Sequence, residues 1–306
     1  MTLPTPADAT DLDAARSVRA SRGRDVALTA AVRTCLWPAA ATLWHREMTR
    51  FFRQRHRVLS ALVSPAILWL LLGAGLSGSF VYPGGENAAA GAGAGVGYSE
   101  YFFFGAVSMI LLFAAVFSTI TVIEERREGF LQGVLVAPVP RLAIVLGKVL
   151  GGACIAMVHA MVFLLLWPLA MPLPSDVGQW LGVGGAILMM GVLAVGLTGL
   201  GLCVAWPMRS TAGFHAIMML LLMPMWFLSG AVFPAGGASA WMGWLMHLNP
   251  MSYGQAAISG LASGGRVETG LVVPVWASAG IAIVITAAAV TGAVALVARP
   301  GREGVS

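Results

Sequence analysis

The sequence predicts an all-α integral membrane protein with six transmembrane helices. Of its 306 residues 58% are hydrophobic and only 10% are charged, and the mean hydropathy is +0.84. Soluble domains carry about 25% charged residues, so this chain lacks the polar surface that water requires. Six apolar runs occur along it, each of the roughly 17–25 residues that cross a hydrocarbon core.

The six predicted spans lie at about 58–80, 101–123, 144–169, 181–205, 213–233 and 272–297. No span carries a charge near its middle. Lys148 lies near the start of the third span, from where its long side chain is expected to reach the interface. Small residues four apart, Gly147 with Gly151 and Gly182 with Ala186, favour close helix packing. The first span begins too late in the chain, and is too long, for a signal peptide.

The basic residues predict the orientation in the membrane. Seventeen of the eighteen Lys and Arg residues lie before span one, around the 124–143 loop, between spans four and five, or after span six. The alternate loops hold only Arg266. By the positive-inside rule both termini are cytoplasmic. The predicted organisation is a flexible cytoplasmic tail (1–37), a six-span domain (38–297) and a short cytoplasmic tail (298–306), placed in the cell (inner) membrane.

Residues 41–57, ATLWHREMTRFFRQRHR, predict an amphipathic helix ahead of the first span. At 100° per residue its arginines share one face and its large apolar residues share the other. Such a helix can lie in the cytoplasmic interface with its arginines toward lipid phosphates, although a plain basic flank is the alternative. The residues assigned to it are Trp44, Arg46, Met48, Arg50, Phe51 and Arg53.

The loop after span two, EERREGFLQGVLVAPVPR at 124–141, predicts a short amphipathic helix. Glu124 and Arg127, three residues apart, can pair on one helical turn. Four apolar residues, Phe130, Leu131, Val134 and Leu135, then recur with helical spacing. Pro138 and Pro140 end the helix, because proline lacks the amide hydrogen. An apolar face with no core of its own needs a partner: lipid, the rest of the chain or another protein.

This loop and the start of the third span resemble the signature of ABC-2 type permeases, close to the drug-exporter (daunorubicin-resistance) branch. The match runs through an acid–arginine start, a Gly-x-Leu, a Pro-Val and a final Gly-Lys. A second stretch, LSGAVFP followed by a tryptophan and NPMSY, resembles the segment after span five in that family. Its residues are Ser229, Gly230, Phe233, Pro234, Trp241, Asn249, Pro250 and Tyr253.

The resemblance implies the permease subunit of an ATP-driven exporter. The 124–141 loop would be the coupling helix that docks in a separate ATPase subunit, residues 41–57 the elbow helix, and 234–271 short re-entrant helices on the outer side. Two ATPase subunits and a second permease half, identical or paralogous, are the implied partners, besides the lipid bilayer. The residues implied in coupling are Glu125, Arg126, Gly129, Phe130, Leu131, Val134, Leu135, Pro138 and Arg141.

The chain contains no GxxxxGK[ST] phosphate loop, so ATP and Mg²⁺ are expected only on the partner ATPase. Neither a catalytic set nor a metal site is expected, since Cys154 and His159 do not share a helical face. His159 and His215 are expected as hydrogen-bonded structural residues, with a proton-relay role as the alternative. The basic residues follow topology rather than a groove, which excludes nucleic-acid binding.

The uncharged spans favour a hydrophobic or amphipathic substrate, drug-like or lipid, and a lipid-linked glycan is the alternative. The methionines of spans four and five are expected to pack or face lipid, or to line an adaptable substrate path. An ion-coupled carrier is a competing class, but it predicts intramembrane acids or broken-helix repeats that the sequence lacks. A membrane enzyme is a third class, but it would need a set of catalytic residues, and the sequence shows none.

Overall fold

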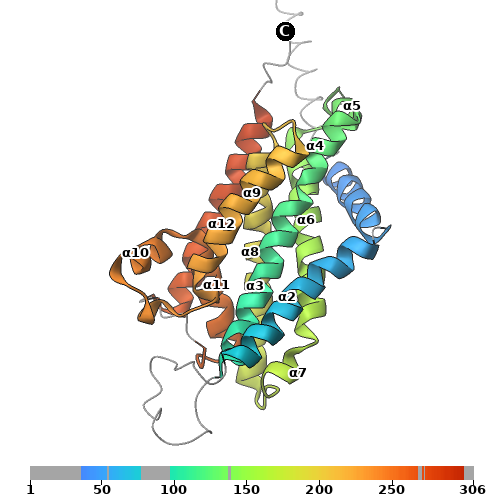
Figure 1. Cartoon of the computed structure of the whole chain (residues 1–306). Helices are drawn as coiled ribbons and strands as arrows, with labels where there is room; N and C mark the ends of the chain where they lie inside the picture. Colours follow the sequence, from blue (N-terminus) through green and yellow to red (C-terminus); the bar gives the residue numbers. More distant parts are fainter. Residues whose placement is uncertain are drawn as a thin grey trace, which may run out of the picture.

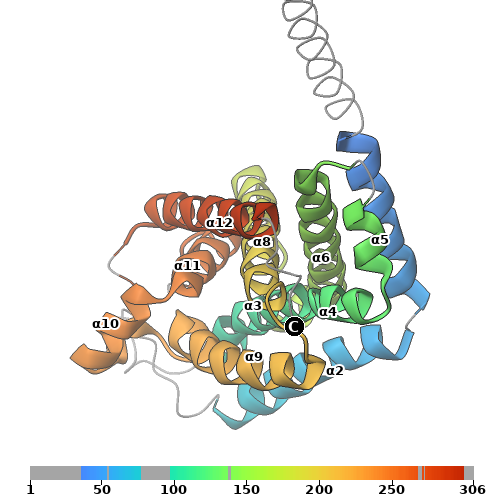
Figure 2. The ribbon, with the colours of Figure 1, turned by 90° about the horizontal axis from the view of Figure 1, so that it is seen from above.

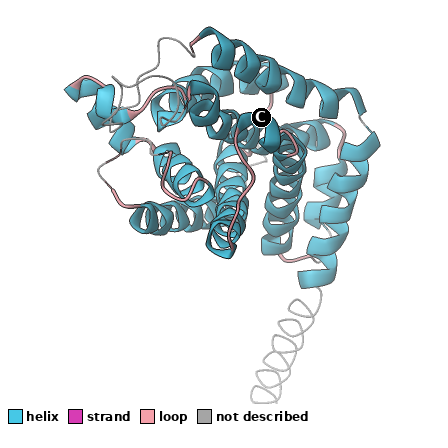
Figure 3. Ribbon diagram, turned by 90° about the horizontal axis from the view of Figure 1, so that it is seen from below, coloured by secondary structure: helices cyan, strands magenta, loops and turns pink. Residues whose placement is uncertain are grey.

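The structure, a computed structural model, describes residues 36–53, 55–76, 97–136, 139–267, 271 and 273–299, without the side chains of 55–61 and 237. Most of both predicted tails, Pro138, Cys35, the end of the first predicted span (77–80) and most of the predicted outer loop at about 81–100 lie outside the described residues. Every regular element in the described residues is helical, and most helices follow one another through short loops (Figure 3).

A helix over residues 36–53, the N-terminal helix, precedes the labelled elements and is drawn in blue (Figure 1). The long helices stand beside one another, with α4 and α5 at one end of the bundle, called the α5 end, and α7 at the other (Figure 1). The elements are α2 (Arg55–Gly75), α3 (Tyr98–Ser118), α4 (Ile120–Arg127), α5 (Phe130–Val136), α6 (Arg141–Leu164), α7 (Trp167–Ala170), α8 (Val177–Ala205), α9 (Thr211–Trp226), the π-helix η1 (Phe227–Ala231), the 3-10 helix η2 (Ala235–Gly237), α10 (Ala240–Leu248), α11 (Pro250–Ala262) and α12 (Val275–Ala298).

Five described helical stretches are long and apolar enough to cross a bilayer, which confirms a multi-pass membrane protein. They are Tyr98–Arg127, Arg141–Leu164, Val177–Ala205, Thr211–Ala231 and Val275–Ala298. The first predicted span falls on α2 (Arg55–Gly75), whose described side chains, from Leu62 to Gly75, form an apolar helix, so a sixth span stays a prediction. The predicted helix 41–57 falls on two helices, the N-terminal helix and α2, which run in different directions (Figure 1).

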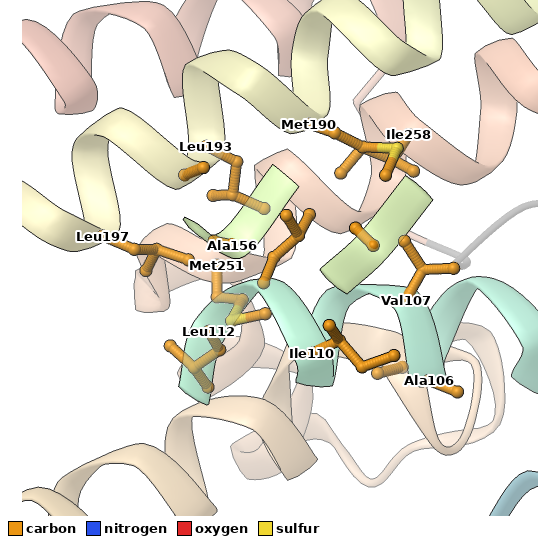
Figure 4. Packing of buried hydrophobic residues seen from close by; sticks show 14 of the residues in the cluster. Ala106, Val107, Ile110, Leu112, Ala156, Met190, Leu193, Leu197, Met251 and Ile258 are labelled. Atoms are coloured by element: carbon orange, nitrogen blue, oxygen red, sulfur yellow. The ribbon is translucent and has the colours of Figure 1, made fainter. Parts of the chain in front are cut away.

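The core of the bundle is built around α3, which packs against α2, α6, α8 and α9. Consecutive phenylalanines Phe102, Phe103 and Phe104 are fully buried, because neighbouring helices cover every side of α3. Nearer its middle, Ile110 and Leu112 lie among aliphatic and methionine side chains from α8 and α11 (Figure 4). By contrast, α9 and α12 leave most of their apolar surface exposed, so lipid or another protein chain must cover these two helices.

The segment between the fifth and sixth predicted spans forms two short helices. α10 projects from the side of the bundle and exposes Trp241 and Trp244 (Figure 1). α11 packs between α8 and α12 and is largely buried. A Cβ atom on Gly182 of α8 would lie 2.5 Å from the Leu261 carbonyl oxygen, so only glycine permits this contact. The predicted role of this glycine in close packing is confirmed, while the re-entrant placement of α10 and α11 in a membrane stays a prediction.

Candidate functional site

The N-terminal helix is seated directly on α6. Cβ atoms built on Gly147 and Gly151 would lie 2.7 Å from the Leu43 Cβ and 3.0 Å from the Glu47 Cβ. The two glycines predicted to permit close packing therefore accept this helix. Further along, Met48 and Phe51 are buried in a small apolar cluster on α6. The apolar face was expected in lipid, but these two side chains pack on the protein instead.

A network of ion pairs ties the N-terminal helix to α4 and α6. The Glu125 carboxylate is 0% exposed and pairs with both Arg46 and Lys148. Lys148 also pairs with Glu47, whose side chain is equally buried. These four residues, Arg46, Glu47, Glu125 and Lys148, are called the buried charge network. Its charges balance, which is the condition under which buried ionised groups are tolerated.

The network corrects two expectations about where basic side chains point. Arg46 and Arg50 were expected to face lipid phosphates, yet Arg46 pairs with Glu125, and an Arg50 nitrogen lies 2.5 Å from the Glu124 carboxylate. Lys148 was expected to reach the interface, yet it is buried between two carboxylates. In both cases a buried or half-buried acid provides a stronger partner than solvent. Glu47 was not identified at all.

Two further arginines connect the same segment to distant elements. The Arg126 guanidinium lies 5.3 Å from the Trp206 ring and donates to the Met208 carbonyl at 3.4 Å, which joins α4 to the α8–α9 turn. Arg141 donates to the carbonyl oxygens of Val297 and Arg299 at 2.9 and 3.0 Å. A cation there caps the C-terminus of α12, where carbonyls lack helical partners. Arg141, the first residue of α6, therefore binds the C-terminal end of α12 rather than α5.

α5 itself is a two-turn helix joined to α4 by a tight turn. Gly129 makes this turn with φ +79°, a conformation that glycine adopts without strain. Leu131 points inward and is 2% exposed, packed with Val122 and Val149. Phe130 lies under the Arg46 guanidinium, 3.6 Å from its ring centroid. The predicted apolar stripe is therefore divided between an inward and an outward part.

The free surface of α5 lies at its C-terminal end. Leu135 is partly exposed and Val136 is 87% exposed, while Val134 just before them is half-buried. Arg127 and Glu128 are exposed at the start of the same loop, and the predicted Glu124–Arg127 pair is replaced by the Glu124–Arg50 pair. α5 lies beside the N-terminal helix at the edge of the bundle (Figure 2). This combination gives a small apolar surface on a rigid support.

The second predicted group gathers around a break in the fifth span. The π-helix η1 follows α9, and Gly230 within it has φ +78°. A π-helical turn leaves backbone carbonyls without their usual helical partners. Asn249, the N-cap of α11, donates to the Met225 carbonyl at 2.6 Å, and Ser252 of α11 donates to the Leu228 carbonyl at 3.1 Å. Ser229 and Gly230, two residues of the predicted motif, are buried here.

Residues of α3 complete this support and were not predicted. Tyr98 donates to the Val232 carbonyl at 3.0 Å, and Tyr101 donates to the Gly230 carbonyl. Pro250 starts α11 next to its cap Asn249, and Tyr253 donates to the His247 carbonyl at 2.7 Å. Two predicted residues of the motif do not donate hydrogen bonds to the η1 carbonyls: Pro234 precedes η2, and Trp241 is exposed on α10. The motif thus holds a broken helix end in one conformation.

Comparison with known proteins covers both of these segments. The model of the family described as ABC-2 type transporter matches residues 39–262, from the N-terminal helix to the end of α11. A protein of Pyropia yezoensis named as a transport permease, ycf38, is 26% identical over 212 residues, which cover 68% of each chain. Both the α4–α5 segment and the η1–α11 segment lie within the region that the family model matches.

Proposed function

This chain belongs to the ABC-2 type transporter family, and on that premise we propose that it is the permease subunit of an ATP-driven exporter that works with a separate ATPase. Two permease copies, or this chain and a paralogue, would assemble with two ATPase subunits. The α5 end would face the cytoplasm, as the distribution of basic residues favours. ATP and Mg²⁺ would bind the partner.

The observation that carries the proposal is that α5 exposes an apolar end while its segment is tied by ion pairs and hydrogen bonds to several other helices. Its outward surface, Leu135 and Val136, is free among the described residues, while the segment that bears it is tied to the rest of the bundle. Glu125 joins it to the N-terminal helix and α6, and Arg126 joins it to the α8–α9 turn. A displacement of α5 would therefore move several helices together, as coupling to an ATPase requires.

The substrate and the second permease half follow from the exposed apolar helices. α9 and α12 present wide apolar surfaces, which suit lipid on one side and another permease half on the other. Three of the five spans, Val177–Ala205, Thr211–Ala231 and Val275–Ala298, contain no Asp, Glu, Lys or Arg, so they offer little to an ionic solute. A hydrophobic or amphipathic small molecule or lipid is the proposed substrate class, with a lipid-linked glycan as the alternative.

The test is the double substitution Leu135→Asp with Val136→Asp, in the permease co-expressed with the ATP-binding-cassette ATPase of its source organism. Because both side chains are exposed, the fold should survive and only docking should change. We expect the ATPase to be lost on purification of the permease, and transport-coupled ATP hydrolysis with it. Substituting Phe130 and Leu131 would be a poorer test, because buried Leu131 stabilises the bundle.

The matched control is Leu173→Asp with Val177→Asp, at exposed positions just before and at the start of α8, at the opposite end. It adds the same two charges to an exposed leucine and an exposed valine, and it should leave both co-purification and coupled hydrolysis unchanged. Retention of the ATPase by the α5 variant would refute the docking assignment. Transport that continues at full rate without the ATPase would refute the exporter class and favour an ion-coupled carrier.

A further inference from the structure

A cavity of about 550 Å³ opens beside α3 within the single chain. Its walls come from the N-terminal helix, α2, α3, α4, α6 and α9. α2 and α9 both contact α3. Sites for drug-sized ligands have volumes of about 300–1,000 Å³. The cavity is therefore large enough for one such molecule and lies away from the α5 surface.

The apolar part of the wall is aromatic and methionine-rich. The Phe113 and Phe117 rings stack with centroids 5.9 Å apart, and His215 lies 4.9 Å from the Phe117 ring. Met219 and Met223 of α9 line the same cavity. Aromatic rings stack on flat apolar groups, and methionine side chains adapt to different shapes. Such a wall suits a planar apolar body.

The charged groups in the wall are neutralised within the protein. Glu47 is paired with Lys148, and Arg50 is paired with Glu124 at 2.5 Å. The two charged lining residues are opposite in sign, so the wall offers no excess charge to attract an ion. Transfer of a charged ligand into such a site would lose hydration without an ionic partner. The cavity therefore selects against ions and favours an uncharged molecule.

Two hydroxyl groups of the wall, those of Ser118 and Thr121, can act as hydrogen-bond acceptors. Ser118 donates its hydroxyl hydrogen to the Ala115 carbonyl at 2.6 Å, and Thr121 donates to the Ser118 carbonyl at 3.0 Å. Each hydroxyl oxygen keeps lone pairs that can accept. A ligand with a hydroxyl or N–H donor at one end would match these two hydroxyl groups.

We propose that this cavity binds one uncharged amphipathic molecule per chain, with a flat apolar body against Phe113, Phe117 and Met219 and a hydrogen-bond donor toward Ser118 and Thr121. That this cavity is a substrate site of the exporter rests on the proposed function. Binding itself requires neither the ATPase nor a second permease half, because a single chain supplies every wall.

The probe is 2-hydroxy-Nile red, an uncharged planar amphipath with a hydroxyl group, titrated into the purified full-length permease in phosphatidylcholine nanodiscs. Empty nanodiscs provide the lipid background, which is subtracted. We expect saturable binding with one probe per chain. Met219→Trp should fill the cavity and weaken binding at least tenfold. Leu220→Trp is the matched control, because the neighbouring Leu220 is 78% exposed and does not line the cavity.

A second variant tests the hydrogen-bonding end. Thr121→Val should weaken the hydroxylated probe about two- to tenfold, the range of one lost hydrogen bond, and leave unhydroxylated Nile red unaffected. Thermal unfolding of each variant establishes that it is folded. The cation tetraphenylphosphonium should not compete.

Several results would overturn the proposal. They are the absence of saturable binding above empty nanodiscs, equal losses in Met219→Trp and Leu220→Trp, full competition by tetraphenylphosphonium, or a co-purified phospholipid that the probe cannot displace. The assay separates this proposal from the proposed function. If binding fails while the α5 variant still loses its ATPase, only the cavity assignment falls; if binding holds while the ATPase does not couple, the exporter role falls.

Discussion

Replacing Lys148 by methionine tests whether the buried charge network holds the N-terminal helix to the bundle. Methionine keeps the unbranched length of the side chain and removes its charge. Lys148 is the ion-pair partner that the described residues provide for Glu47, and it shares Glu125 with Arg46. The substitution therefore leaves one uncompensated negative charge in a site where both carboxylates are buried.

The expected cost follows from burial. Removing one partner of a buried ion pair costs about 3–5 kcal/mol, because the remaining charge stays desolvated. This corresponds to a rise of roughly 100- to 5,000-fold in the unfolding equilibrium constant. Arg50→Met is the matched control, since Arg50 and Glu124 have side chains 26% and 34% exposed. A pair about one third exposed is partly screened by solvent, and its loss should cost less, on the order of 1 kcal/mol.

The assay is denaturant unfolding of the purified variants in detergent micelles, followed by tryptophan fluorescence. A second substitution, Glu47→Gln, in the Lys148→Met background removes the orphaned carboxylate and should restore much of the lost stability. If Lys148→Met and Arg50→Met lose equal stability, or if Glu47→Gln gives no recovery, the buried charge network does not stabilise the fold as argued.

Two further substitutions use the same unfolding assay. Gly105→Ala should lower the free energy of unfolding by about 1–3 kcal/mol, because the added Cβ would lie 2.3 Å from the Ala231 carbonyl oxygen. Gly184→Ala is the control: its Cβ would have nothing within 4 Å, so it should be neutral or stabilising. Equal effects of the two substitutions would contradict the close approach of α3 to η1. Leu131→Ala should lower the free energy of unfolding by about 2–5 kcal/mol, because Leu131 is buried, and Leu135→Ala should change it by no more than about 0.5 kcal/mol. The reverse order of these two effects would show that α5 is rotated about its axis.

Much of the bundle could be predicted, because a long apolar run has few alternatives to a membrane-spanning helix. Helix ends were less accessible. α8 begins at Val177 rather than 181, since Asp176 caps it by accepting from the Gln179 amide at 2.8 Å. The π-helical end of the fifth span could not be foreseen, because its stability comes from hydrogen bonds with Tyr101 of α3 and Asn249, the N-cap of α11.

The candidate site could be predicted as a segment but not as a surface. The apolar spacing places a helix at Phe130–Val136, as the structure has it. The spacing cannot decide which side of so short a helix faces the bundle, and packing against Val149 turns Leu131 inward. Ion-pair partners were equally hidden, since Glu47 and Lys148 are 101 residues apart and only the tertiary fold brings them together.

The central claim, that the free end of α5 docks on a partner ATPase, is tested most directly by site-specific photocrosslinking. Benzoylphenylalanine replaces Val136 in the permease co-expressed with its ATPase, and the same group at Leu173 serves as the control at the opposite end. The account predicts a covalent permease–ATPase product from position 136 and none from position 173. No product from position 136, or equal products from both, would contradict it.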